Sequence, residues 1–96
     1  MPELTGKQRR HLRALGHHLH AVVQVGREGV TDALAGQADE QLAAHELIKV
    51  KISDDHDRHE IAAALAQRCG ASLAQVLGRT ALLYRRRQEK PEIELP

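Results

Sequence analysis

The segment from Val22 to Thr31 constrains the fold of this chain more than any other part of the sequence. Residues 22–25, Val-Val-Gln-Val, form a mostly β-branched apolar run that predicts a strand, and the run leads directly into the tetrapeptide Gly26–Gly29. Thr31 then offers a side-chain oxygen that can cap the start of a helix. A glycine loop between a strand and a helix start lets backbone N–H groups approach an anion, and the helix dipole favours negative charge there. The sequence therefore predicts an anion-binding loop, for which a nucleic-acid backbone is our working ligand.

Hydrophobic periodicity along the rest of the chain predicts a small α+β domain with the element order α-β-α-β-α-β-β. Leu47–Ile52 is the clearest strand, because its β-branched side chains point to one face while Lys49 and Lys51 point to the other. Two apolar runs around Gly78-Arg79-Thr80 predict a β-hairpin. We expect a mixed sheet of about four strands with packed helices. The expected helices cover about 5–16, 31–44 and 58–69, and the expected strands cover about 21–25, 47–52, 73–77 and 81–85.

The length of 96 residues predicts a single domain over residues 1–96, with residues 88–96 as an extended, loosely held tail. Cys69 is the only cysteine, which excludes an internal disulfide and fits a reducing cytosol. Its place on an apolar helix face predicts a small buried side chain. No apolar run approaches the roughly 18 residues of a membrane span, and the N-terminal residues lack a signal-peptide pattern. We expect a soluble cytoplasmic protein, and a monomer.

The first helix has two different sides. Thr5 and Gln8 form a capping-box pattern at its start. The stripe expected to face the core contains Gln8, Leu12, Leu15 and Leu19. The opposite side is basic and contains Lys7, Arg10, Arg13, Ala14 and His17. This pattern predicts a cationic surface, with an ordinary solvated face as the alternative.

Charge is unevenly distributed along the chain, although the net charge is only +1 at pH 7. Residues 1–27 carry five basic residues and one acidic residue, a net charge of +4. Residues 28–60 carry three basic and nine acidic residues, a net charge of −6. Residues 61–96 carry six basic and three acidic residues, a net charge of +3. This asymmetry predicts a basic surface built from the two ends of the chain.

A composite basic surface of this kind has a geometric consequence. Arg10 and Arg13 of the first helix and Arg27 of the glycine loop must share one face of the molecule if they bind the same ligand.

Two other functions fit parts of the sequence. The acidic middle segment, Asp32 to Glu60, could dock a basic protein partner. The seven histidines could serve a metal-dependent hydrolase, but the clusters at 17–20 and 54–59 lack the spacing of a metal motif such as HExxH. No serine, threonine or cysteine lies in the sequence context of an activated nucleophile. We therefore expect no enzyme activity, no small-molecule substrate, no cofactor and no metal.

The glycine loop and the scarcity of aromatic residues together favour one mode of nucleic-acid binding. A GxxG loop clamps the nucleic-acid backbone in KH modules, although two glycines at this spacing also serve as a plain turn. Tyr84 is the only aromatic residue, which argues against a surface that stacks several bases. The residues thus favour backbone contact over base stacking and leave the structural turn as an alternative.

Several motifs resemble, in order and at matching spacing, those of the CRM domain family, the bacterial YhbY-like RNA-binding proteins. These motifs are Leu4–Arg13, His17-His18, Val23–Asp32, His45–Lys51, Gln75–Arg85 and Ile93–Pro96. The resemblance covers essentially the whole chain. It implies a fold similar to the C-terminal domain of bacterial translation initiation factor three, and binding to RNA in precursors of the large ribosomal subunit.

The resemblance also implies where RNA is contacted. The GxxG loop of the family falls on Gly26, Arg27, Glu28 and Gly29. The family commonly has Lys and then Gly at the two middle positions, so Glu28 places a carboxylate where the family has a flexible neutral residue. Together with the residue patterns above, this gives an expected RNA surface that consists of the loop, Lys7, Arg10 and Arg13, extended by Arg79, Arg85, Arg86, Lys49 and Lys51.

Overall fold

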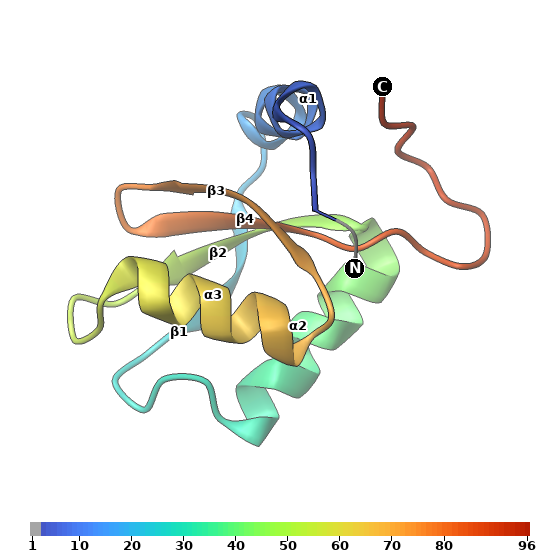
Figure 1. The fold of residues 1–96 in the computed structure, drawn as a ribbon. Coiled ribbons are helices and arrows are strands. Elements are labelled where there is room, and N and C mark those ends of the chain that lie inside the picture. Colours follow the sequence, from blue (N-terminus) through green and yellow to red (C-terminus); the bar gives the residue numbers. More distant parts are fainter. Residues whose placement is uncertain (1–2) are drawn as a thin grey trace.

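Seven elements follow one another in the predicted order in the computed structural model, which describes residues 3–96 (Figure 1). They are α1 (Gly6–Gly16), β1 (Ala21–Val25), α2 (Asp32–His45), β2 (Leu47–Ile52), α3 (Arg58–Arg68), β3 (Ser72–Leu77) and β4 (Thr80–Tyr84). The bounds of β1 and β2 agree with the prediction, and the other elements differ from it by one residue at one or both ends. Within residues 3–96, no helix has the length and apolar character needed to cross a membrane.

The four strands form one mixed sheet in the order β1-β2-β4-β3. β1 and β2 are parallel because α2 carries the chain back between them, whereas β4 runs antiparallel to both β2 and β3. β1 and β3 are therefore the two edges of the sheet. This arrangement confirms the predicted α+β class and mixed sheet.

Helices cover the two faces of the sheet unequally. α2 and α3 pack on one face, and α1 alone crosses the other (Figure 1). The larger core cluster, on the α2 and α3 side, includes Val23, Ile48, Val50, Leu65 and Leu83. The smaller cluster, beneath α1, consists of Leu12, Leu47, Ala74, Leu82 and Tyr84. Because side chains alternate along a strand, Lys49 and Lys51 lie on the α1 side of β2 together with Leu47.

Side-chain caps fix the starts of the helices. At α1, Gln8 N–H donates to Thr5 Oγ1 at 3.1 Å and Thr5 N–H donates to Gln8 Oε1 at 3.0 Å, which confirms the predicted capping box. At α2, Leu34 N–H donates to Thr31 Oγ1 at 3.1 Å. Asp57 caps α3 by accepting two backbone N–H groups, and these bonds hold the pKa of its carboxyl below the usual value.

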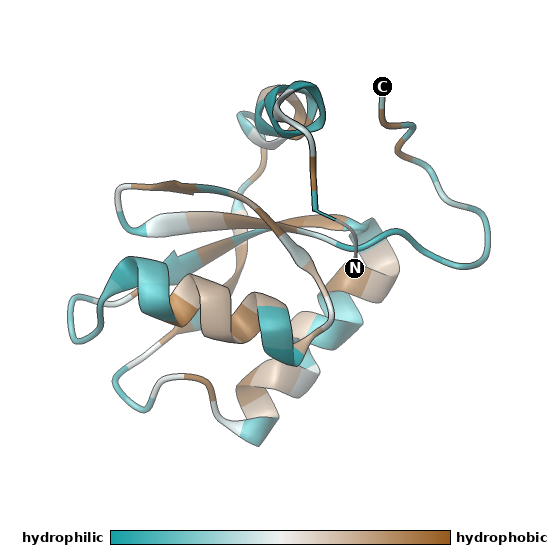
Figure 2. Ribbon diagram, viewed as in Figure 1, coloured by the Kyte–Doolittle hydropathy of each residue, from teal (hydrophilic) through white to brown (hydrophobic). Residues whose placement is uncertain are grey.

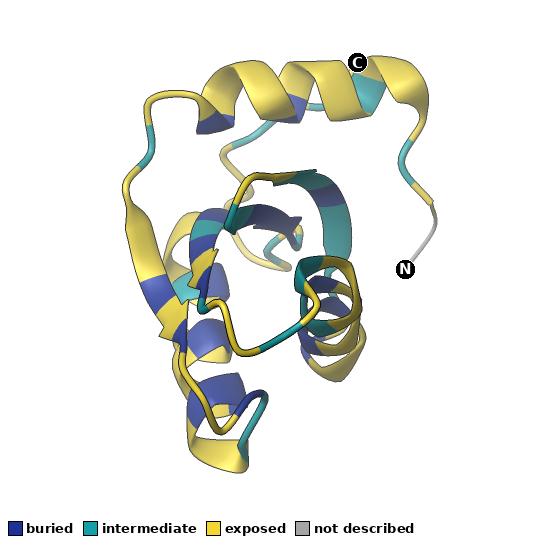
Figure 3. Cartoon of the chain, turned by 90° about the vertical axis from the view of Figure 1, so that its left-hand side faces the viewer, coloured by how far each residue is buried: buried dark blue, intermediate teal, exposed yellow. Residues whose placement is uncertain are grey.

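The buried stripe of α1 differs from the predicted leucine stripe. Leu12 is fully buried, but Leu15 is 42% exposed, so its assignment to the core is wrong. The second buried position is Gly16, where an added Cβ would lie 2.6 Å from Leu82 Cδ1. α1 thus approaches the sheet so closely at its last turn that no side chain fits between them. Figure 3 shows α1 as a largely exposed helix whose few buried positions face the sheet.

Cys69 follows α3 and lies in the larger core cluster. Burial raises the pKa of its thiol, which keeps the group protonated and unreactive. The predicted role as a small buried side chain is confirmed. Figure 2 shows that the helices on the two faces of the sheet differ in hydropathy, with apolar central turns in α3 and a largely hydrophilic α1.

Glu46 is a fully buried acid at the junction of α2 and β2. Its carboxylate accepts the backbone N–H groups of Arg87, Glu92 and Ile93 at 2.9, 2.6 and 3.0 Å. Burial raises the pKa of Glu46, but these three donors and the charge of Arg87 outweigh burial, so the pKa lies below its ordinary value. The backbone φ of +63° places this residue in the left-handed region, where glycine would be the usual choice.

The bonds to Glu46 anchor the C-terminal segment. Residues 88–96 contain no helix or strand, but Ile93 and Leu95 pack against the cluster beneath α1. Gln8 Nε2 also donates to the carbonyl of Pro96 at 3.3 Å. The segment for which the sequence predicts a loosely held tail therefore has specific contacts with α1 and with the end of α2.

Candidate nucleic-acid interface

The outer side of α1 carries exposed basic side chains that have no acidic partner within residues 3–96. Lys7, Arg10, Arg13 and His17 are all exposed, and none forms an ion pair with an acid among residues 3–96. Leu12 and Gly16 hold the opposite side of the helix on the sheet. The predicted division of α1 into a packed side and a basic side is therefore present, although the packed side is narrower than expected.

Lys49 extends this basic side onto the sheet. Together with Arg13 and His17 it lines a hollow of about 350 Å³ between the last turn of α1 and strands β2, β3 and β4. Lys51, two residues along the same face of β2, is exposed. The structure thus brings together one group of the predicted site residues, the cations of α1 and of β2.

The Gly26–Gly29 loop forms a separate feature between β1 and α2. Gly29 N–H donates to Gly26 O at 3.1 Å, and Gly29 adopts a φ of +74°, which a side chain would strain. Arg27 and Glu28, the two middle residues, are exposed. With the start of α2, the loop lines a shallow hollow of about 320 Å³.

His56 supports this loop from the segment between β2 and α3. Its Nε2 lies 3.0 Å from Gly26 O and, because a carbonyl only accepts, the imidazole donates the hydrogen bond. The same ring packs against Gly29, where an added Cβ would lie 3.5 Å from His56 Cε1. In the sequence, His56 is one of two histidines in the cluster at 54–59, and nothing local indicates its contact with Gly26 because the two residues are 30 positions apart.

The glycine loop and α1 lie on opposite sides of the sheet. Figures 1 and 3 both place α1 across one side of the sheet, with the loop at the far end of β1, beside the start of α2. The five residues of β1 separate them, a span of about 17 Å at the usual rise of a strand. The expectation that Arg10, Arg13 and Arg27 share one face is therefore wrong.

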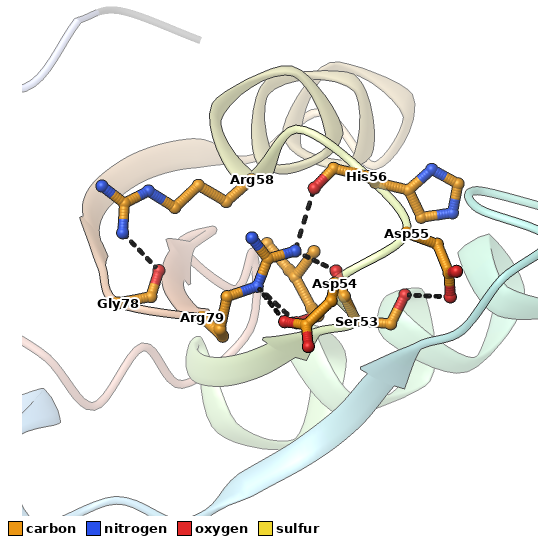
Figure 4. A network of polar contacts seen from close by, with 8 residues as sticks. Ser53, Asp54, Asp55, His56, Arg58, Gly78 and Arg79 are labelled. Atoms are coloured by element: carbon orange, nitrogen blue, oxygen red, sulfur yellow. Dashed lines mark hydrogen bonds and ion pairs between the residues drawn. The ribbon is translucent and has the colours of Figure 1, made fainter.

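Arg79 holds the scaffold together, although the sequence placed it on the RNA surface. Its Nε donates to Ile52 O at 3.1 Å, and its Nη2 donates to the carbonyls of Ser53 and His56, the latter at 2.9 Å. Asp54 Oδ1 lies 3.4 Å from Nε as well. Figure 4 shows the guanidinium surrounded by these groups, so that it joins the β3–β4 turn to the loop after β2.

The arginines that follow β4 are also of two kinds: some form hydrogen bonds within the protein, and one is exposed. Arg85 donates to Asp39 and to the carbonyl of Cys69, the latter at 2.9 Å, and thereby ties β4 to α2 and α3. Arg87 donates to the carbonyls of Ala44 and Lys90. Arg86 is exposed and has no ion pair within residues 3–96. Arg85 is therefore a scaffold residue, and Arg86 stays a candidate for RNA contact.

The acids of the middle segment are largely occupied by contacts within the chain. Asp32, Asp39 and Asp54 form ion pairs with Arg68, Arg85 and Arg79. The hydrogen bond and charge of Arg68 hold the pKa of Asp32 below its usual value. These pairs, together with the buried Glu46, weaken the alternative of an acidic surface that docks a basic protein. In the part of the chain that the structure describes, no three His, Cys, Asp or Glu side chains are placed to hold a metal ion.

Comparison with known proteins gives consistent matches along the chain. A model of the CRS1 / YhbY (CRM) domain matches residues 4–85. "Probable RNA-binding protein YqeI" of Bacillus subtilis (strain 168) is 43% identical over 95 residues, which cover 97% of this chain and 99% of the relative. A Haemophilus influenzae protein named "RNA-binding protein" is 36% identical over 98 residues, which cover 100% and 98%.

A solved structure agrees with these matches. The solution structure of the Staphylococcus aureus protein SAV1595 has a TM-score of 0.85 and 39% sequence identity, and the match covers 97% of this chain and 99% of that one. Sequence and fold are thus both similar to those of relatives of nearly the same length. The chain belongs to the CRS1/YhbY (CRM) domain family.

Proposed function

We propose that this chain binds RNA through α1 and the face of the sheet that α1 crosses. The observation that carries this proposal is the convergence of Arg13 and His17 of α1 with Lys49 of β2 around one hollow. None of the residues that line the hollow is acidic. The names of the relatives, which describe RNA-binding proteins, support the same ligand class.

The chemistry of this surface is that of phosphate binding. Lys7 and Arg10 extend the charge along α1, Lys51 extends it along β2, and Arg86 offers a further exposed cation. Lysine and arginine contacts of this kind position a nucleic-acid backbone without reading its sequence. Because each neutralised phosphate releases counterions, affinity falls steeply as salt increases.

The glycine loop is a second, weaker contact in this proposal. Gly26 and Gly29 allow a close approach to the backbone, and Arg27 supplies one positive charge. Glu28 opposes it from the neighbouring position. Arg79 and Arg85 are left out of the proposed surface because their guanidinium groups hold the scaffold.

Gel-shift titration of a ribosomal RNA fragment at two salt concentrations tests this function. Arg13→Ala is expected to weaken binding several-fold and to reduce the magnitude of the salt slope by about 0.7 to 0.9, the effect of one phosphate contact. Lys90→Ala, which removes the same charge from the C-terminal segment, is the matched control and should behave like the wild type. Equal binding of the wild type and Arg13→Ala at low salt would contradict the proposed surface.

We also propose that the RNA is ribosomal, in precursors of the large subunit in the cytoplasm, which is the role that the family resemblance implies. Co-sedimentation of the tagged protein with particles from a cell lysate tests this role. Wild-type protein is expected in the fractions of large-subunit precursors, and Arg10→Ala/Arg13→Ala protein at the top of the gradient. Wild-type protein that stays at the top, although it binds isolated RNA, would overturn the ribosomal role and leave RNA binding intact.

A further inference from the structure

We infer that the hollow between α1 and the sheet receives one unpaired nucleotide of the RNA. This inference rests on the proposed function and adds the structural class of RNA that the surface prefers. The hollow has a volume of about 350 Å³, near the lower limit of the usual range of about 300 to 1,000 Å³ for small-ligand sites. It has room for a base with its sugar, and a base held in a duplex has no access to it.

The hollow is part of the packing of α1. The contact between Gly16 and Leu82 sets the height of the last turn of α1 above β4. Beside this contact, Ala14 is too small to fill the space. The sheet presents Lys49, Gln75 and Thr80 from below, and these polar side chains would lose hydration if the space closed. The hollow therefore stays open.

Charge at the hollow is suited to the phosphate of a bound nucleotide. Arg13 and Lys49 approach from the helix and the sheet respectively. The carbonyl end of α1 carries partial negative charge and opposes an anion. Arg13, in the last turn of α1, offsets this negative charge, so the phosphate belongs between Arg13 and Lys49, with the base directed toward β3 and β4.

The floor toward β3 and β4 offers groups that suit a base. The amide of Gln75, which lines the hollow, can both donate and accept hydrogen bonds. Thr80 donates its hydroxyl proton to Leu77 O at 2.8 Å, so its oxygen is left to accept. Leu77, 66% exposed, supplies apolar surface for the face of the base.

Fluorescence anisotropy with two RNA hairpins tests this inference. The hairpins share one stem sequence, and one of them carries a single bulged nucleotide. Wild-type protein is expected to bind the bulged hairpin about fivefold more tightly than the plain one, which is the affinity difference that one net hydrogen bond provides. Ala14→Leu, which fills the hollow without changing charge, should bring the ratio of the two affinities to about one. Ala64→Leu, on the exposed side of α3, is the matched control and should retain the preference.

The outcomes separate this inference from the proposed function. Equal binding of the two hairpins by the wild type, or a preference that survives Ala14→Leu in a protein with an unchanged melting temperature, overturns the nucleotide site and leaves RNA binding standing. Binding of neither hairpin at low salt overturns both. Free nucleoside monophosphate forms a further arm, because saturable binding of it combined with equal binding of the hairpins would reassign the hollow to a free nucleotide.

Discussion

At the scale of single residues, we expect Glu28 to reduce the attraction of the glycine loop for a phosphate. Arg27 and Glu28 are neighbours and both are exposed, so their charges largely cancel for an approaching anion. We predict that Glu28→Gln raises RNA affinity by about two- to fivefold at low salt, the usual effect of one exposed charge. The gain should shrink at high salt because of screening. Gel-shift titration measures the effect, and Glu40→Gln, an exposed acid on α2, is the control.

An unchanged affinity in Glu28→Gln would mean that the loop does not approach RNA. An equal gain in Glu28→Gln and Glu40→Gln would show that only the net charge of the protein matters. In either case the proposed interface would be confined to α1 and the sheet.

Glu46 is the residue whose ionisation we expect to affect stability most directly. Its folded pKa lies below the ordinary value of 4.5, so its contribution is fully present above that value and is lost as pH falls through the folded pKa. We predict that Glu46→Gln lowers the free energy of unfolding at pH 7 by about 1 to 3 kcal/mol, because an amide cannot satisfy three N–H donors equally well. Chemical denaturation at several pH values measures this.

The difference between wild type and Glu46→Gln isolates this carboxyl from other acids with lowered pKa values, such as Asp57. The difference should shrink as pH falls below 4.5. A difference that stays constant down to pH 2 would mean that Glu46 acts through shape alone.

At the scale of elements, the contact between α1 and β4 depends on the absence of a side chain at Gly16. In most helices Gly→Ala stabilises by up to about 1 kcal/mol. Here an added Cβ would lie 2.6 Å from Leu82 Cδ1 and 3.2 Å from Leu82 Cγ, and Leu82 is itself buried. We therefore predict that Gly16→Ala destabilises the protein by about 1 to 3 kcal/mol. Thermal or chemical denaturation measures the change.

Gly36→Ala in α2 is the matched control, because nothing lies within 4 Å of an added Cβ there. It should stabilise the protein through helix propensity alone. If both variants shift stability in the same direction, the close approach of α1 is not what Gly16 provides.

The elements themselves could be predicted from the sequence because their signals are local. The capping box at Thr5, the cap at Thr31 and the alternation along β2 each lie within a few residues of one another. Apart from the β3–β4 hairpin, which the turn at Gly78 marks, the contacts between elements could not be predicted from these local signals. From the sequence, Gly16 indicates only the end of a helix. Its role in the packing of α1 becomes clear only in the structure, where Leu82 lies beneath it.

The same limit applies to the candidate site. Arg79 follows a glycine and Arg10 lies in a basic stretch. Nothing in the neighbouring sequence shows which of the two has a structural role and which is free to contact RNA. Arg79 becomes a scaffold residue only because the fold brings carbonyls of the loop after β2 around it. Lys49 gains its proposed role in the same way, from the position of α1 over the sheet.

At the scale of the whole molecule, the sheet divides the candidate RNA contacts into two groups. α1 and the lysines of β2 lie on one side, and the glycine loop lies at the far end of β1, on the side of α2 and α3. We therefore expect the two groups to contact different parts of a bound RNA. RNA binding by α1 and by the loop should therefore be energetically separable.

Double-mutant cycles measure this separation. We predict that the effects of Arg13→Ala and Arg27→Ala on RNA binding free energy add within about 0.3 to 0.5 kcal/mol, as expected for distant sites. Arg13→Ala and Lys49→Ala remove charges around one hollow, so their coupling should exceed about 0.5 kcal/mol. Gel-shift titrations with one RNA at one salt concentration provide all the affinities. Coupling between Arg13 and Arg27 as strong as that between Arg13 and Lys49 would mean that a single RNA element wraps around the edge at β1, and that the sheet does not separate two contacts.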